Sequence, residues 1–262
     1  VGDGRPGYRS IGFNLLRPGP WQDLRVRKAI SLWVDRKQGG EATRGGRGAE
    51  LGGEGVPRGL FHPDTPYANP DYLPGPGFNP ATRDRDRAEA KRLLAEAGYP
   101  NGFKASFLCR SVNWVPECEF FTEQMRTLGL NIAIDLRGVA DFEAANRAGT
   151  YELAIGGGGG AGFPEAHRYQ IGSLAISDAS NTRHNDAKVD EYFTRIEAAP
   201  KFEERIKLSR ELERYLLLDR AYIVTSWTQV YWQPFRTYVK GVLDPIAEPC
   251  NFCDYATVWL DK

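Results

Sequence analysis

The chain has 262 residues, with 34 basic and 34 acidic side chains and therefore no formal net charge. This balance lacks the basic excess that is typical of nucleic-acid-binding domains and of polybasic membrane-surface segments. Hydrophobic residues make up 41% and charged residues 26%, values typical of folded globular proteins, so wholesale disorder is excluded. No stretch approaches the roughly 18 apolar residues of a membrane-spanning helix, and the length suits one large domain or two lobes.

The first third of the chain predicts a strand, a helix and a long loop. Residues 11–16 form the first expected strand, and residues 23–35 form a helix that begins at the N-cap residue Asp23. The apolar side chains of this helix share one face: Val26, Ala29, Ile30 and Trp33. Residues 39–59 hold nine glycines and few large apolar side chains, so we expect a mobile loop there. The Pro-rich residues 63–80 predict an irregular but better anchored segment.

Helical and extended patterns then alternate to residue 232. Helices are expected from Asp84 to a stop at Gly98, from Pro116 to Gly129, at 141–148, around 189–196 and at 202–218. Strands are expected at 104–109, 131–139, 152–155 and 222–232. In the strand at 131–139, Ile132, Ile134 and Leu136 alternate with polar or small residues, as in a half-buried strand. Strands that alternate with helices imply an α/β domain with a parallel or mixed sheet.

Three segments, taken in order, carry a resemblance to a known family. The first is Phe13-Asn14 followed by Asp23-Leu-Arg-Val-Arg-Lys-Ala-Ile-Ser and Asp35-Arg36. The second is Ala88-Glu-Ala-Lys-Arg-Leu-Leu-Ala-Glu-Ala-Gly-Tyr-Pro-Asn-Gly-Phe103. The third comprises Val189-Asp190, Arg205, Glu211, residues 221–224 and Val239-Lys-Gly-Val242. In this order they resemble the extracellular solute-binding proteins of ABC importers, family 5, the dipeptide, oligopeptide and nickel-binding type.

The resemblance covers nearly all of this chain but only the C-terminal half of a typical member. It implies the C-terminal lobe of a class II periplasmic-binding-protein fold, an α/β lobe with a mixed sheet flanked by helices. Residues 1–13 would be a connecting strand from a missing N-terminal lobe, residues 14–222 the ligand-binding lobe with its Gly-rich loop at 39–59, and residues 223–262 a returning C-terminal segment. The first residue is Val1, not Met. The alternative is a naturally half-length protein.

The same resemblance implies a receptor without enzymatic activity. Such receptors bind a peptide or peptide-like small molecule between two lobes and deliver it to ABC permease subunits by lobe closure. It further implies a monomeric bacterial protein of the periplasm or cell exterior, lipid-anchored if a preceding part of the chain supplies an anchor, with no cofactor and no nucleic-acid partner. A single lobe should bind its solute weakly, because half of the enclosing wall is absent.

The expected ligand site centres on a glycine run that follows the strand at 152–155. Family members that bind free peptides often carry a Trp and then an Asp here. This chain has Gly159 nearest the Trp position and Gly162 nearest the Asp position, which puts recognition of a peptide amine in doubt. Glu165 is a possible substitute, and bare glycines would leave room for a bulky ligand or an anion; a simply flexible loop is an equal alternative. The expected contacts are Trp114, Gly159, Gly160, Ala161, Gly162, Phe163, Glu165, Arg168, Tyr169, Trp227 and Gln229.

Each of these side chains also has an ordinary structural interpretation. Trp114 could be packed at a loop tip, Trp227 could belong to the sheet core, and Arg168 and Arg183 could be solvated surface residues. All three histidines, at positions 62, 167 and 184, are interpreted as surface loop residues.

Four cysteines permit two disulfides in three connectivities. A secreted family favours the pairs Cys109–Cys118, which would staple the loop that carries Trp114, and Cys250–Cys253. The C-x-x-C spacing of the second pair leaves open a thiol- or metal-dependent enzyme, although no second such pair and no His cluster accompany it. Neither a nucleophile motif with a placed His nor a phosphate-binding loop is present. A scaffold lobe without a ligand site is a third alternative.

Overall fold

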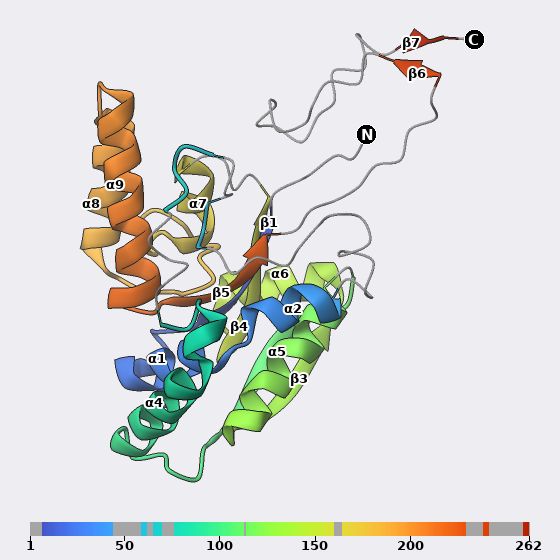
Figure 1. Ribbon diagram of the computed structural model, residues 1–262, viewed down its shortest axis with the longest axis vertical. Coiled ribbons are helices and arrows are strands. Elements are labelled where there is room, and N and C mark those ends of the chain that lie inside the picture. Colours follow the sequence, from blue (N-terminus) through green and yellow to red (C-terminus); the bar gives the residue numbers. More distant parts are fainter. Residues whose placement is uncertain are drawn as a thin grey trace.

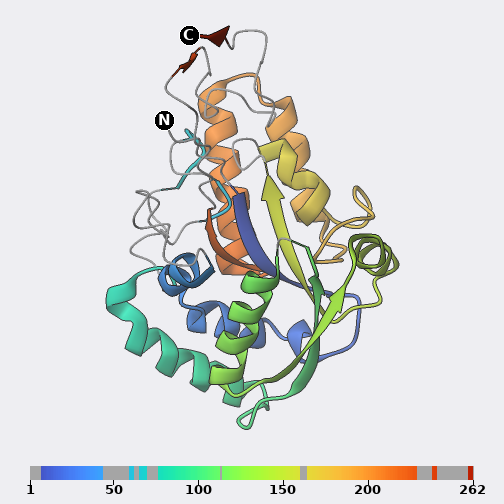
Figure 2. The same ribbon diagram turned by 90° about the vertical axis from the view of Figure 1, so that its right-hand side faces the viewer.

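The computed structural model describes residues 7–43, 59–61, 65–69, 76–112, 114–159, 164–228, 238–240 and 259–261. In these residues the central feature is a five-stranded mixed sheet in the order β3-β2-β4-β1-β5. Its strands are β1 (Gly7–Phe13), β2 (Lys104–Arg110), β3 (Asn131–Arg137), β4 (Leu153–Gly159) and β5 (Ile223–Thr228). Strand β2 is parallel to β3 and β4, whereas β1 is antiparallel to both β4 and β5. Figure 2 shows β1 between β4 and β5.

Helices surround this sheet (Figure 1). They are η1 (Pro20–Gln22), α1 (Leu24–Trp33), α2 (Arg36–Thr43), η3 (Pro80–Thr82), α4 (Arg83–Glu96), α5 (Val115–Leu128), α6 (Val139–Ala148), α7 (Pro164–Ile171), α8 (Ala187–Ala198), α9 (Phe202–Arg214) and the π-helical turn η4 (Tyr215–Asp219). Helix α1 packs along α4, α8 along α9, and α5 against β2 and β3. Strands β6 (Val239–Lys240) and β7 (Trp259–Leu260) form a separate antiparallel pair. The mixed sheet flanked by helices confirms the predicted fold class.

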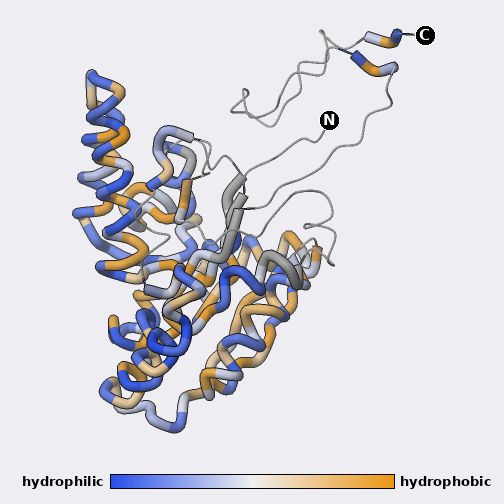
Figure 3. Tube along the Cα trace, in the orientation of Figure 1, coloured by the Kyte–Doolittle hydropathy of each residue, from blue (hydrophilic) through white to orange (hydrophobic). Residues whose placement is uncertain are grey.

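The beginning of α1 follows directly from its sequence. The Asp23 side chain accepts a hydrogen bond from the backbone N–H of Arg25 at 2.8 Å, which satisfies one of the free donors of the first turn. The four apolar residues predicted to share a face are all buried. The same agreement holds for α8, whose Val189, Phe193 and Ile196 are buried, and Figure 3 shows hydrophobic positions alternating with hydrophilic ones along α8 and α9.

Two clusters of buried side chains stabilise the described part of the chain. The first joins the sheet to α1, α4, α5 and α6 and includes Phe107, Phe121 and Trp21. The second lies between α8, α9 and η4 and also buries Leu60 and Phe61. None of the described helices is long and apolar enough to span a membrane.

Two of the predicted elements have different limits in the structure. Strand β4 continues beyond Ile155 through Gly159, because Gly156–Gly159 pair with Ser10, Arg9, Tyr8 and Gly7 of β1. Helix α2 occupies the first five residues of the loop expected at 39–59, since the Asp35 side chain accepts a hydrogen bond from the backbone N–H of Gln38 at 2.9 Å and starts the helix. Residues 44–58 of that loop lie outside the described residues.

The prediction for β3 is only partly correct. Ile132 is buried, but Ile134 is 37% exposed and Leu136 is 50% exposed. Strand β3 is the outermost strand of the described sheet, so these side chains have a neighbouring strand on one side only.

One close approach requires glycine in β1. A Cβ on Gly12 would lie 2.6 Å from the backbone oxygen of Asn181, so the segment around Asn181 packs directly on the sheet backbone. Asn14, just beyond β1, holds the neighbouring connection in place. Its Nδ2 donates to the backbone oxygens of Gly149 (3.0 Å) and Tyr151 (2.9 Å).

Two arginines of the α1 region are buried and act as structural cross-links. Arg27 donates to the backbone oxygens of Trp21 (2.6 Å) and Arg220 (3.0 Å), and burial lowers the pKa of its guanidinium to about 10. Arg36 donates to the backbone oxygens of Ser31 and Gly77, among others, and burial lowers its pKa to about 9. Both therefore keep their charge at neutral pH.

Glu213 of α9 is a buried carboxyl group, 1% exposed. Its Oε1 accepts hydrogen bonds from the backbone N–H groups of Leu60 (2.5 Å) and Phe61 (3.3 Å). Burial raises the pKa of Glu213 to about 8, although the two hydrogen bonds lower it in part. A Cβ on Gly59 would collide with this carboxylate, so a larger residue there would have to displace the Glu213 side chain.

Candidate ligand-binding site

The direction of the strands singles out one edge of the sheet. Strands β2, β3, β4 and β5 run the same way, so their carboxyl ends lie together, and β1 starts at this edge because Gly7 pairs with Gly159. We call it the carboxyl edge. In open α/β sheets ligands bind outside the carboxyl ends of the strands, where the connecting segments meet.

Trp114 lies at the carboxyl edge with two arginines beside it. It is half-buried and directly precedes α5. The guanidinium carbon of Arg9 lies 4.7 Å from the centroid of the Trp114 ring, and that of Arg110 lies 4.9 Å from it. The ring of Phe142 from α6 contacts Trp114 in an edge-on arrangement at 5.9 Å. Cation–π attraction of about 0.5 to 2 kcal/mol per pair helps to hold each guanidinium at the Trp114 ring.

Among the described residues, one carboxylate is paired with the two arginines beside Trp114. Arg9 is 6% exposed, and its Nε lies 3.9 Å from Oε1 of Glu117 in the first turn of α5. Arg110, the last residue of β2, forms no ion pair with any described residue, and its buried Nε has no hydrogen-bond partner among them. At the end of β3, Arg137 is paired with Asp135 at 2.7 Å. The guanidinium of Arg110 is therefore suited to an anionic group of a ligand.

A disulfide closes the segment that carries these residues. Cys109 and Cys118 are bonded, with their Cα atoms 6.1 Å apart, and both are fully buried. The bridge joins the end of β2 to the first turns of α5. The structure thus contains the first of the two expected bridges, whereas Cys250 and Cys253 lie outside the described residues.

The predicted contacts after β4 are arranged differently from the expectation. Glu165, His167, Arg168 and Tyr169 lie on helix α7, not on a loop, because Pro164 begins a helix that has Glu165 in its first turn. Glu165 pairs with Arg205 of α9, and Arg168 pairs with Glu197 of α8 at 2.6 Å. Tyr169 is 55% exposed. The two charged residues are therefore already paired within the lobe and are not brought to Trp114.

Other predicted contacts can be placed only by their backbone or not at all. Gly159 is the last residue of β4 and pairs with Gly7. Trp227 lies in β5, where the register with β1 shifts between Tyr8 and Ser10, so the strand pair has an irregularity opposite Arg9. Residues 160–163, which include Gly160, Ala161, Gly162 and Phe163, and Gln229 lie outside the described residues.

The interpretation of the histidines as surface residues is wrong for two of them. His184 is 3% exposed and stacks on Tyr222 with ring centroids 4.7 Å apart. Its Nδ1 accepts from the backbone N–H of Asp186 at 3.1 Å, so its proton lies on Nε2, which donates to the backbone oxygen of Ile171 at 3.0 Å. His167 is 2% exposed, and burial lowers its pKa to about 4. Both are neutral interior residues, and His62 lies outside the described residues.

Arg183 also has a structural role. Its Nη1 donates to the backbone oxygens of Asn146 (3.1 Å) and Arg147 (2.8 Å) at the carboxyl end of α6. A cation at this position satisfies the last carbonyls of the helix, so the side chain is engaged within the lobe.

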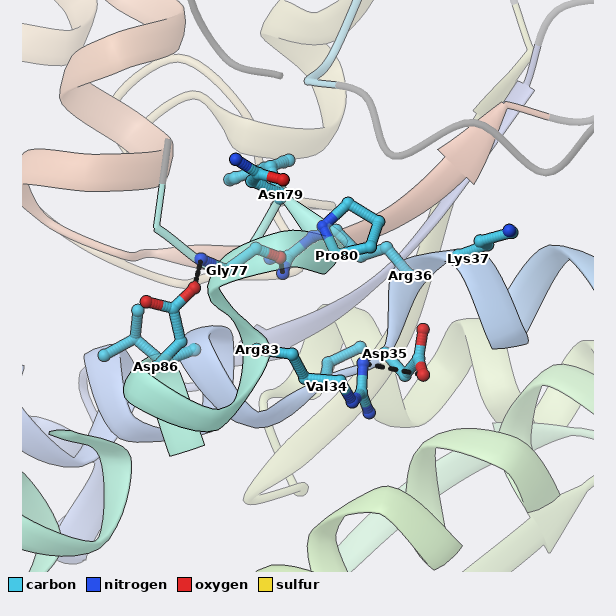
Figure 4. A pocket seen from close by; sticks show the side chains of 11 residues that line it. Val34, Asp35, Arg36, Lys37, Gly77, Asn79, Pro80, Arg83 and Asp86 are labelled. Atoms are coloured by element: carbon cyan, nitrogen blue, oxygen red, sulfur yellow. Dashed lines mark hydrogen bonds and ion pairs between the residues drawn. The ribbon is translucent and has the colours of Figure 1, made fainter. Parts of the chain in front are cut away.

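Cavities lined by described residues also occur away from Trp114. A cavity of about 20 Å³ lies near the junction of α1 and α2. Its wall includes Arg83 and Asp35, which form an ion pair at 2.6 Å (Figure 4). This volume suffices for about one water molecule. An open groove of about 420 Å³ follows α9, where Lys207 and Arg214 are paired with acidic neighbours. Among the described residues no three His, Cys, Asp or Glu side chains are grouped as metal ligands.

Comparisons with known proteins agree with this fold. The model of the family "Bacterial extracellular solute-binding proteins, family 5 Middle" matches residues 2–180. Heme-binding protein A of Haemophilus influenzae is 26% identical over 239 residues, which are 88% of this chain and 41% of that protein. The Escherichia coli murein tripeptide binding protein MppA superimposes with a TM-score of 0.78 at 18% identity, covering 100% of this chain and 49% of that one.

A dipeptide binding protein from Pseudoalteromonas sp. SM9913, solved in complex with Met-Leu, gives a TM-score of 0.75 at 17% identity. That match covers 99% of this chain and 49% of the other. The chain thus spans less than half the length of each of these three relatives. The family match over residues 2–180 includes β1 to β4 and Arg9, Arg110 and Trp114. The chain belongs to the bacterial extracellular solute-binding proteins of family 5.

Proposed function

We propose that this chain is the C-terminal lobe of the solute receptor of an ABC import system, and that it binds an anionic group of a peptide or peptide-like solute at the carboxyl edge. The observation that carries the proposal is Arg110, which lies 4.9 Å from the Trp114 ring centroid and forms no ion pair among the described residues. Trp114 supplies apolar area, and the guanidinium supplies orientation, which is the usual division of roles in solute sites.

The relatives support a carboxylate as this anionic group. One is named for haem and another was solved with Met-Leu. Haem carries propionates and a dipeptide carries a terminal carboxylate, so both ligands could pair with a guanidinium. These relatives are binding proteins, and the proposed role includes no catalysis.

The arrangement of β1 and β5 supports the proposed division of the chain. The two strands are adjacent and antiparallel, so the chain enters and leaves the sheet side by side at the carboxyl edge. Residues 1–13 and 223–262 would then connect residues 14–222 to a second lobe, whose closure would expel water from the solute and present it to the permease. The proposed setting is the periplasm or the cell exterior, with a monomeric receptor.

Replacing Arg110 with Gln should weaken binding of Met-Leu by about tenfold or more, since a charge-assisted pair is lost from a half-buried position. Because one lobe encloses a ligand on one side only, we expect affinities of about millimolar, measurable by NMR titration of the whole chain. Arg168→Gln, in which the altered residue is paired with Glu197, is the matched control and should bind as the unaltered chain does. Equal affinities for the Arg110→Gln variant and the unaltered chain would contradict the proposal.

A further inference from the structure

The Cys109–Cys118 disulfide encloses the residues proposed to bind the solute. Cys109 directly precedes Arg110, and Cys118 directly follows Glu117, the partner of Arg9. We propose that this disulfide positions Arg110 and Trp114 for the anionic group of the solute, so that its reduction weakens solute binding while the lobe stays folded. The inference rests on the proposed function, because it concerns the same site.

Among the described residues, two backbone hydrogen bonds also hold this segment. The backbone N–H of Ser111 donates to the backbone oxygen of Arg137 at 2.8 Å, and the N–H of Cys118 donates to that of Trp114 at 3.0 Å. Trp114, at the N-cap position of α5, makes no side-chain capping bond. Ser111 and Val112 are exposed. A covalent link between the two ends therefore removes much of the conformational freedom that the segment would otherwise lose on binding.

The restraint matters for binding because charged side chains lie at the Trp114 ring. Arg9 and Arg110 both lie within 5 Å of the Trp114 ring centroid, at 4.7 and 4.9 Å. Without the bridge, the segment would be free to move Arg110 and Trp114 apart from one another. The disulfide restrains the backbone on both sides of these two residues. An anionic group can then pair with the Arg110 guanidinium beside the Trp114 ring without first ordering the segment.

The lobe should survive reduction because the bridge is part of a packed core. Both cysteines are buried in the cluster that includes Phe107 and Phe121, whose rings are in edge-on contact at 6.5 Å. Two buried thiols act as small hydrophobic side chains and keep most of this packing. In the reduction, the S–S bond accepts two electrons and two protons and becomes two thiols, while a dithiol reductant loses them and becomes a disulfide.

The test uses the whole chain with Cys250→Ala and Cys253→Ala, so that any effect of reductant comes from the 109–118 pair. Met-Leu and its C-terminal amide are titrated by NMR before and after reduction with dithiothreitol, and against a Cys109→Ala/Cys118→Val variant. We expect Met-Leu to bind about tenfold more weakly without the bridge, and its advantage over the amide to shrink, while amide spectra remain dispersed. Reoxidation should restore both values.

The outcomes separate the two proposals. Absence of Met-Leu binding, or equal binding of the amide, in the oxidised chain would overturn the proposed function. Binding by the oxidised chain that reduction leaves unchanged would overturn only the role of the disulfide. Collapse of the folded spectrum on reduction would also overturn it, since the bridge would then act as a general stabiliser; if only the double variant unfolds, the reduced chain still decides.

Discussion

Replacing Arg36 with Met will lower the free energy of unfolding by about 3 to 5 kcal/mol, although it removes a charge from the protein interior. The guanidinium of Arg36 is 2% exposed and donates to three backbone oxygens, those of Ser31 (2.7 Å), Gly77 (2.6 Å) and Thr225 (2.8 Å). It also lies 4.1 Å from the ring centroid of Phe78. Methionine fills similar space but cannot donate to these carbonyls, and the loss of a hydrogen bond to a buried group costs about 1 to 3 kcal/mol.

The measurement is urea-induced unfolding of the whole chain, followed by circular dichroism. Arg85→Met is the matched control, because the Arg85 side chain is 68% exposed and contacts only Asp86 among the ion pairs of the described residues. The free energy of unfolding of this control variant should differ from that of the unaltered chain by no more than about 0.5 kcal/mol. A loss below about 1 kcal/mol for Arg36→Met would show that this arginine does not link α1, the Gly77 region and β5 as the structure indicates.

The second large effect concerns Glu213 and pH. Its pKa in the folded chain is about 8, above the value of 4.5 expected in the unfolded chain. Between these values the folded state holds a proton that the unfolded state has lost, so the free energy of unfolding falls as pH rises. From about pH 5.5 to about pH 8.5 this single group should remove on the order of 3 kcal/mol. Below about pH 4.5 both states are protonated, and this dependence vanishes.

Glu213→Gln should flatten this part of the pH profile, since the amide does not titrate but can still accept from Leu60 and Phe61. Glu191→Gln, at a side chain that is 64% exposed on α8, provides the control and should follow the unaltered chain. Urea unfolding at about pH 5.5 and about pH 8.5 measures how much the free energy of unfolding of each variant changes with pH. The same slope in Glu213→Gln as in the unaltered chain would exclude a buried carboxyl with a raised pKa at this position.

The parts of the fold that sequence predicts well depend on local pattern. Asp23 and the apolar face of α1 follow from capping and from the helical period, and both are confirmed. The carboxyl end of β4 could not be predicted from such a local pattern. Its glycines carry no apolar alternation, and they form a strand because β1, nearly 150 residues earlier in the chain, supplies the partner.

Buried charges are the main feature that sequence could not reveal. In the sequence, Arg36 and Glu213 are ordinary charged residues, yet each is buried among backbone groups supplied by distant segments. The same holds for the site. Trp114 was expected, but Arg9 and Arg110 were missed because an arginine in a strand usually marks a solvent-facing position. The one signal was Arg110 at the end of a strand, next to a cysteine and shortly before Trp114.

The most direct test of a solute site at the carboxyl edge is a map of where Met-Leu binds. Backbone amide shifts of the whole isotopically labelled chain would be followed during titration, with N-acetylated, amidated Met-Leu as the uncharged comparison. We expect Met-Leu to shift the amides of residues 9 and 110–117 at the carboxyl edge, and the uncharged form to shift them far less. Shifts confined to α8 and α9, or equal shifts with both compounds, would contradict the claim that this lobe binds an anionic solute group at the carboxyl edge.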